Sequence, residues 1–105
     1  MKINILGTEY EVIKDVKRDS DETLKAGADG YVDHHDKKIV LAEIEDDPDM
    51  TDNIDGYKQH VFRHEIIHAF FFEAGLTDWA NDERITEYLS VQIPKMSKLF
   101  KEMGI

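Results

Sequence analysis

Residues 61–72 read Val-Phe-Arg-His-Glu-Ile-Ile-His-Ala-Phe-Phe-Phe, and this stretch decides the fold that the sequence predicts. No residue from about Ile54 to Ala74 interrupts a helix, and Gly75 follows, where a left-handed glycine commonly ends one. The apolar residues of this segment cover nearly every direction around the helix axis. A helix of that kind is buried on all sides, so we expect it to form the centre of the domain.

A His-Glu-x-x-His motif, His64 to His68, lies inside this apolar helix. Residues four apart share one helical face, so His64 and His68 can direct imidazole nitrogens at a single metal ion. Glu65 is offset by about 100° around the axis and can reach a water on that metal without binding it. Catalytic zinc sites use this division between ligands and base. The motif therefore predicts a zinc metallopeptidase, a hydrolase in which His64 and His68 bind Zn²⁺ and Glu65 is the catalytic base.

The third ligand must come from outside the motif. An extended motif with a third histidine would need glycine at 71 and histidine at 74, and Phe71 and Ala74 exclude it. Glu83 and Glu87 follow on the next predicted helix; they are four residues apart, so both can face the metal. One of the two would then be the third ligand, and the other would be a solvent-facing carboxylate. Glu73 is expected to project away from the site as a surface residue.

Three further residues could assist at the predicted site. His60 precedes the motif by one turn and could line the cleft or stabilise an oxyanion, although a surface histidine is the more common outcome. Tyr57 and Tyr88 could donate phenolic hydrogen bonds to an oxyanion, and each is more often an aromatic at the edge of a core. His34 and His35 are expected to be plain turn residues.

The N-terminal part of the chain predicts a small sheet. Lys2–Leu6 and Tyr10–Val16 have the pattern of two antiparallel strands around a turn at Gly7. Tyr31–Asp33 and Lys38–Ala42 predict a second hairpin with a polar tip. Residues 19–29 and the acidic residues 43–55 are expected to be loops.

After the central helix, a second helix is predicted from about Asp82 to Ile93, where Pro94 interrupts it, and a short last helix from Lys95 to Met103. The expected fold is thus α+β: a small twisted antiparallel sheet packed on the buried motif helix, with two C-terminal helices closing the other side.

Composition limits the class of protein. The 105 residues suffice for a single domain, residues 1–105. The net charge of −10, from 23 acidic and 13 basic residues, gives no basic face for nucleic acid. The chain contains no cysteine and no apolar stretch long enough for a bilayer. Because the residues after Gly7 turn polar at once, we expect no signal peptide. We expect a cytoplasmic protein that binds no nucleic acid and no membrane.

The run Arg63–Phe70, together with Asn81-Asp82-Glu83 and a helix that ends Val91-Gln92-Ile93-Pro94, resembles the minimal zincins. These include the ImmA/IrrE-type zinc-peptidase-like proteins of bacteria, phages and mobile elements. The resemblance covers residues 31–96. In that family the glutamate eleven residues before the proline is the third ligand, which implies Glu83 here.

The same resemblance implies an upstream strand along the cleft, and Lys38–Ala42 matches its placement. A peptide would then add a strand at this sheet edge. A phage or mobile-element setting is also implied, where relatives act on regulatory proteins. Thr86, Glu87 and Leu89 replace the alanine and phenylalanine usual after the ligand, so Glu87 stays open as the alternative.

We therefore expect a single minimal zincin-like metallopeptidase domain that hydrolyses peptide bonds of a peptide or protein substrate. The alternative is a non-catalytic, zinc-stabilised protein-interaction module derived from such a peptidase, because a chain of 105 residues offers only a shallow cleft. In a purely structural site, another ligand would close the fourth coordination position. A third reading is a metal-free protein in which the motif arises by chance. The sequence determines neither the substrate nor the oligomeric state.

Overall fold

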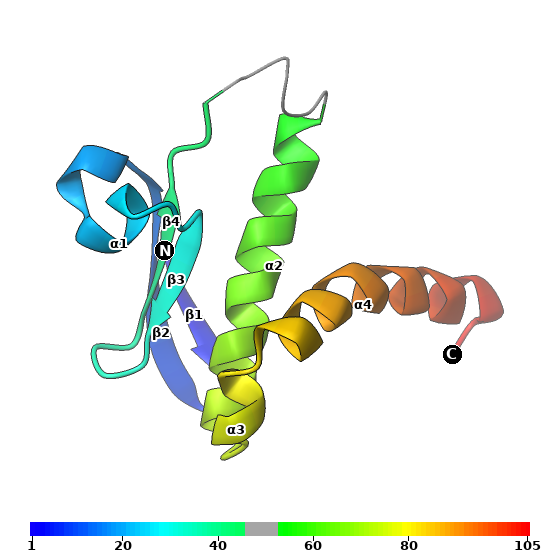
Figure 1. Ribbon diagram of the computed structural model, residues 1–105. Helices are drawn as coiled ribbons and strands as arrows, with labels where there is room; N and C mark the ends of the chain where they lie inside the picture. The colour runs from blue at the N-terminus through cyan, green and yellow to red at the C-terminus, as the bar shows by residue number, and fades with distance from the viewer. Residues whose placement is uncertain (46–52) are drawn as a thin grey trace.

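The computed structural model describes residues 1–45 and 53–105 as an α+β fold, in which a four-stranded sheet packs against a long helix (Figure 1). The strand order is β1-β2-β4-β3. The strands are β1 (Lys2–Ile5), β2 (Thr8–Val16), β3 (Gly30–Asp33) and β4 (Lys38–Ala42).

The two predicted hairpins are confirmed. β1 pairs antiparallel with β2 through a two-residue turn in which Leu6 and Gly7 both have positive φ, as tight hairpins require. β3 pairs antiparallel with β4. The hairpins join through β2 and β4, which run parallel. The sheet is therefore mixed, and the expectation of a purely antiparallel sheet was wrong.

The apolar character of β4 explains this strand order. Its four apolar residues are all buried: Ile39, Val40, Leu41 and Ala42. The strand is therefore apolar on both faces, as strands inside a sheet are. β3 is half-buried throughout and forms one edge of the sheet. Lys38–Ala42 was expected at the sheet edge beside the cleft, and the structure corrects this placement: β4 is central and β3 is the edge strand.

The segment expected to be a loop from residue 19 to 29 contains a 3-10 turn, η1 (Arg18–Ser20), and a short helix, α1 (Glu22–Lys25). The Asp21 side chain accepts hydrogen bonds from the backbone amides of Thr23 and Leu24 and so caps α1. Leu24 is fully buried against Val40 and Ala42. Arg18 also donates to the backbone carbonyls of Leu24 and Ala28, so capping, burial of Leu24 and this guanidinium together order the polar segment.

The predicted central helix is confirmed as α2 (Ile54–Glu73), and Gly75 follows it with a φ of +80°. Val61 and Ala69 of α2 pack on Tyr10 and the inner face of the sheet. The expectation of burial on all sides was wrong: Asp55, Lys58, Gln59 and Phe70 are exposed, and Phe70 is 46% exposed. The predicted acidic loop before α2 lies largely at residues 46–52, outside the described residues.

α3 (Thr77–Ala80) and α4 (Glu83–Met103) cover the other side of α2, where Ile67 and Phe71 pack on Ala80. α4 continues through Pro94, so the two predicted C-terminal helices are one. A proline inside a helix removes one hydrogen bond and bends the helix, and the good helix formers beyond it continue this one. The second half of α4 projects away from the domain and does not close its other side (Figure 1).

Over the two described ranges, no helix combines the length and the apolar character that crossing a membrane would require.

Candidate metal centre

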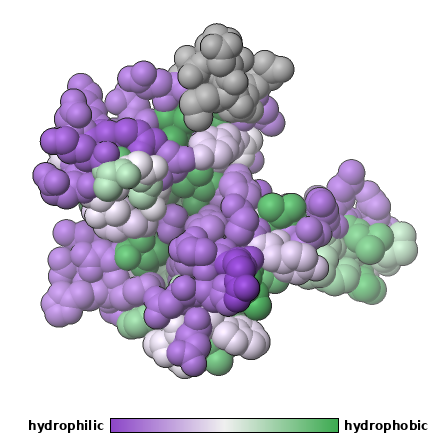
Figure 2. Space-filling model, in the orientation of Figure 1, coloured by the Kyte–Doolittle hydropathy of each residue, from purple (hydrophilic) through white to green (hydrophobic). Residues whose placement is uncertain are grey.

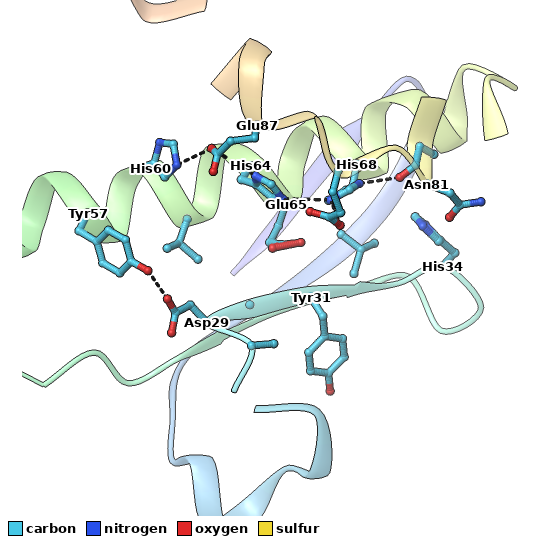
Figure 3. Close-up of a pocket in the computed structure, with 16 residues that line it drawn as sticks. Asp29, Tyr31, His34, Tyr57, His60, His64, Glu65, His68, Asn81 and Glu87 are labelled. Atoms are coloured by element: carbon cyan, nitrogen blue, oxygen red, sulfur yellow. Dashed lines mark hydrogen bonds and ion pairs between the residues drawn. The ribbon is translucent and has the colours of Figure 1, made fainter. Parts of the chain in front are cut away.

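A cleft of about 630 Å³ opens beside α2, and most of the residues discussed for the site line it (Figure 3). α2 forms one wall with His64, Glu65 and His68. The edge strand β3 forms the opposite wall, the connection from α3 to α4 contributes Asn81, and the first turns of α4 contribute Glu83 and Glu87. The cleft therefore joins segments from three parts of the chain.

Three side chains converge at one point in this cleft. His64 Nε2 and His68 Nε2 are 3.1 Å apart. Glu83 Oε2 lies 3.0 Å from His64 Nε2, and Glu83 Oε1 lies 2.9 Å from His68 Nε2. These are the three residues of the described chain that could hold a metal ion together. The structure thus brings Glu83, rather than Glu87, to the two ring nitrogens that face each other.

The contact made by Nδ1 of His68 determines whether Nε2 has a lone pair for a metal ion. His68 Nδ1 lies 2.6 Å from the backbone carbonyl of Ala80 in α3. A carbonyl only accepts, so Nδ1 carries the proton and the neutral ring keeps a lone pair on Nε2. His68 is 7% exposed. Because α3 packs on α2, its carbonyl orients this imidazole.

Glu87 lies on the other side of His64. Its Oε1 is 3.6 Å from His64 Nδ1, 2.6 Å from His60 Nε2, and accepts a hydrogen bond of 2.7 Å from Ser90 Oγ. The Ser90 hydrogen bond is the main cause that lowers the pKa of Glu87. At 3.6 Å the contact with His64 Nδ1 is an ion-pair distance and not a hydrogen bond. The negative charge beside Nδ1 favours a proton on that nitrogen and so a lone pair on Nε2.

This donor set fits a metal ion. When Nδ1 carries the proton in both rings, the two Nε2 atoms direct lone pairs toward each other and toward the Glu83 carboxylate, so three electron-rich groups face one another. A cation among them would remove the repulsion. A tetrahedral zinc ion with bonds of about 2.0–2.1 Å holds its ligand atoms about 3.3 Å apart, close to the separations here. Two imidazoles and one carboxylate are an established zinc set.

Glu65 points from α2 into the gap between the helix and β3 (Figure 3). It is 6% exposed, and burial raises the pKa of its carboxyl to about 7. The strand passes very close: a Cβ at Gly30 would lie 3.1 Å from Glu65 Cγ. Gly30 is therefore needed to let β3 approach the carboxyl-bearing side chain.

The other candidates have different positions. His60 lines the cleft through its pair with Glu87. Tyr57 also lines it, but its hydroxyl donates to Asp29, and this hydrogen bond is the main cause that raises the pKa of Tyr57 to about 12. Tyr88 is 62% exposed and does not line the cleft, because its side of α4 faces away from α2.

His34 was expected to be only a turn residue, yet it lines the cleft. Its ring stacks on Phe72 with centroids 4.1 Å apart, and burial is the main cause that lowers its pKa. Gly30 and Val32 of β3 and His34, which directly follows the strand, alternate, and all three line the cleft toward α2. That period of two was the signal in the sequence that could have placed Gly30 and His34 at the site.

Glu73 was expected to be a surface residue, and the structure overturns this. Its carboxylate accepts hydrogen bonds from Thr8 and Tyr10 of β2 and from Lys37 in the β3–β4 turn. The side chain is 12% exposed. The sequence could not indicate this, because the three partners lie 36 to 65 residues away in the chain.

No protein-family model matches the chain, and neither a curated protein nor a solved structure matches it.

Proposed function

We propose that this protein is a zinc-dependent peptidase with a zincin-like site. The observation that carries the proposal is the convergence of His64 Nε2, His68 Nε2 and the Glu83 carboxylate at separations of 2.9–3.1 Å. The resemblance of the motif and of Glu83 to the minimal zincins supports the same assignment. Two neutral imidazoles and a carboxylate leave one position of a tetrahedral ion open, as catalytic sites do.

Zinc, when bound, would polarise a water and the scissile carbonyl. The chain itself would supply the base: Glu65 lies in the same cleft but outside the three-residue cluster. Its carboxylate would take the proton of the attacking water and transfer it to the leaving amine. The Ala80 carbonyl and Glu87 would hold the two imidazoles in the tautomer that binds the metal.

The substrate proposed is an extended peptide beside β3. Among the described residues β3 pairs with β4 on one side only, so its outer edge offers backbone groups for another strand. Gly30 and Val32 of β3 and Glu65 of α2 line the same cleft. A peptide on this edge would therefore pass the base. This replaces the expected position beside β4.

The test combines metal analysis with one conservative substitution. Protein purified without added metal should contain about one zinc ion per chain, and His64→Ala or His68→Ala should lose it. Glu65→Gln should keep the zinc ion and the melting temperature, because Glu65 does not touch the metal. The same change should reduce cleavage of a peptide selected from a diverse library by about 10²–10⁴-fold, since an amide cannot accept the proton.

Two results would contradict the proposal. A folded protein that cannot take up zinc would remove the metal site. A protein that holds zinc, cleaves nothing across the library, and retains its biological role as Glu65→Gln would be a zinc-stabilised interaction module instead.

A further inference from the structure

The second half of α4 carries an apolar stripe that the rest of the described chain does not cover. Four apolar residues follow each other here at spacings of three and four: Ile93, Met96, Phe100 and Met103. Because of this spacing they lie on one side of the helix. Their side chains are between 38% and 64% exposed. Figure 2 shows apolar residues, in green, gathered along this projecting helix. We call these four residues, with Leu99, the tail stripe.

The tail stripe continues a surface that is already used for packing. Ile85 and Leu89, on the same side of α4, pack against Ile67 and Phe71 of α2. The spacing of four residues from Leu89 to Ile93 and then three to Met96 keeps this face in line. One face of α4 is therefore covered in its first half and open in its second. An exposed apolar face of this length marks an interaction site.

The end of the helix forms part of this surface. Gly104 has a φ of +73°, and the Ile105 amide donates to the Phe100 carbonyl at 2.9 Å. A glycine with positive φ, followed by a residue whose amide bonds back to the last turn, commonly ends a helix. This helix end leaves a shallow groove lined by Ile93, Met96, Ser97, Phe100, Lys101 and Ile105.

Charge indicates what covers the tail stripe. Residues 94–105 contain three of the 13 basic residues, Lys95, Lys98 and Lys101, but only one of the 23 acidic residues, Glu102. The remainder of the chain is therefore strongly acidic. Pairing two tails in opposite directions keeps each basic end near the acidic domain of the other copy. A parallel pair would instead place the two acidic domains side by side.

The residues that flank the stripe also suit pairing between helices. Gln92 and Ser97, next to the stripe, are uncharged, and Lys98 lies on the opposite side of the helix. Lys101 lines the groove beside Phe100 and Ile105. The Lys101 ammonium stands at the end of a long side chain that reaches water at the rim, so two such stripes can pair without burying its charge. A surface that pairs with itself about a twofold axis needs this self-complementarity.

We propose that the tail stripe pairs antiparallel with the tail stripe of a second copy, so that the protein is a twofold symmetric dimer. The pairing buries Met96, Phe100 and Met103 of both copies. The pairing does not use the residues of the cleft, because no residue of 93–105 is among those that line it. The dimer is therefore independent of the proposed peptidase activity.

The oligomeric state of the full chain tests this proposal. Sedimentation or light scattering across micromolar to several hundred micromolar protein should show a concentration-dependent dimer. Phe100→Glu introduces two charges into the pair and should raise the dimer dissociation constant at least about 100-fold. Lys98→Gln, on the opposite side, should leave it within about threefold. Both variants should keep the wild-type circular dichroism and zinc content.

Directed crosslinking tests the antiparallel arrangement. The chain has no cysteine, so a single one can be introduced. Ser97→Cys, near the middle of the stripe, should form a disulfide-linked dimer under mild oxidation, and Lys98→Cys should not. A wild type that stays monomeric at every concentration overturns the proposal. So does equal crosslinking of both variants, or a monomer that instead binds phosphatidylserine vesicles through Phe100.

Discussion

At the scale of single residues, the neighbours of each imidazole decide what it can bind. His68 donates from Nδ1 to the Ala80 carbonyl, and His64 has Glu87 on its Nδ1 side. Both rings therefore present Nε2 to each other and to Glu83. The partner of the second nitrogen orients a histidine ligand and sets its tautomer, so the roles of Glu83 and Glu87 differ although they are one turn apart.

This difference can be measured by zinc affinity. Glu83→Gln removes the carboxylate closest to both Nε2 atoms and should weaken zinc binding by more than about 100-fold. Glu87→Gln removes only a group that orients His64 and should cost about 10-fold. Competition with a chromophoric chelator gives both values. A larger loss for Glu87→Gln would place the ligand one turn further along α4.

Gly30 permits a second test at this scale. A Cβ at this position would lie 3.1 Å from Glu65 Cγ and from Leu41 Cδ2, closer than ordinary contacts, so Glu65 or β3 must shift slightly. Small misplacement of a reacting group is costly to rate. Gly30→Ala should reduce peptide cleavage about 10-fold or more, while zinc content stays at the wild-type level. Full cleavage activity in this variant would show that Glu65 tolerates displacement.

At the scale of elements, Glu73 connects three of them. The last residue of α2 binds Thr8 and Tyr10 of β2 and Lys37 in the β3–β4 turn. The Lys37 hydrogen bond is the main cause that lowers the pKa of Glu73 from 4.5 to about 2, with Tyr10 next. The carboxylate form is therefore the one that holds the end of α2 on the sheet.

The pH dependence of stability follows from this pKa. Because the pKa is lower in the folded state, the stabilisation by Glu73 is present above about pH 4.5 and is lost as pH falls toward about 2. Glu73→Gln should lower the free energy of unfolding by about 1–3 kcal/mol at pH 7, and the gap to wild type should narrow at pH 3. Urea unfolding at both pH values measures this.

The exposed Glu102 provides the control for that experiment. Glu102→Gln should change stability by less than about 0.5 kcal/mol at either pH. An equal gap between wild type and Glu73→Gln at pH 7 and pH 3 would show that the side chain acts through shape and not through its charge.

At the scale of the whole molecule, the site joins side chains from two parts of the fold. His64 and His68 belong to α2, which packs on the sheet, and Glu83 begins α4, which packs on the far side of α2. Asp82 caps α4 by accepting hydrogen bonds from the amides of Arg84 and Ile85. An ion held by all three ligands would restrain the first turn of α4 against α2.

Metal removal should therefore destabilise the protein. A ligand at about 1,000 times its dissociation constant stabilises the folded state by about 4 kcal/mol, which corresponds to a rise in melting temperature of about 10 °C or more for a domain of this size. Treatment with a chelator should lower the melting temperature by this amount, and added zinc should restore it. His64→Ala should melt at one temperature in both conditions. A wild type that behaves in the same way would argue against the site.

The sequence by itself determined the central helix, the two hairpins and the spacing of His64, Glu65 and His68. These features depend on residues near one another in the chain: helical periodicity, turn glycines, and the four-residue repeat that places two side chains on one face. Two predictions that relied on local sequence preference were wrong. Pro94 predicted the end of a helix, but α4 continues through it. The polar residues after β2 predicted a loop, but they contain the short helix α1.

Only the tertiary structure decided the strand order, the edge strand at the cleft, the partners of Glu73 and the position of Glu83 beside both imidazoles. Each depends on contacts between segments far apart in the chain, which no local pattern encodes. Glu83 and Glu87 are equivalent by spacing alone. The packing of α3 on α2, through the Ala80 carbonyl and the cap at Asp82, sets how α4 begins and so brings Glu83 to the ring nitrogens.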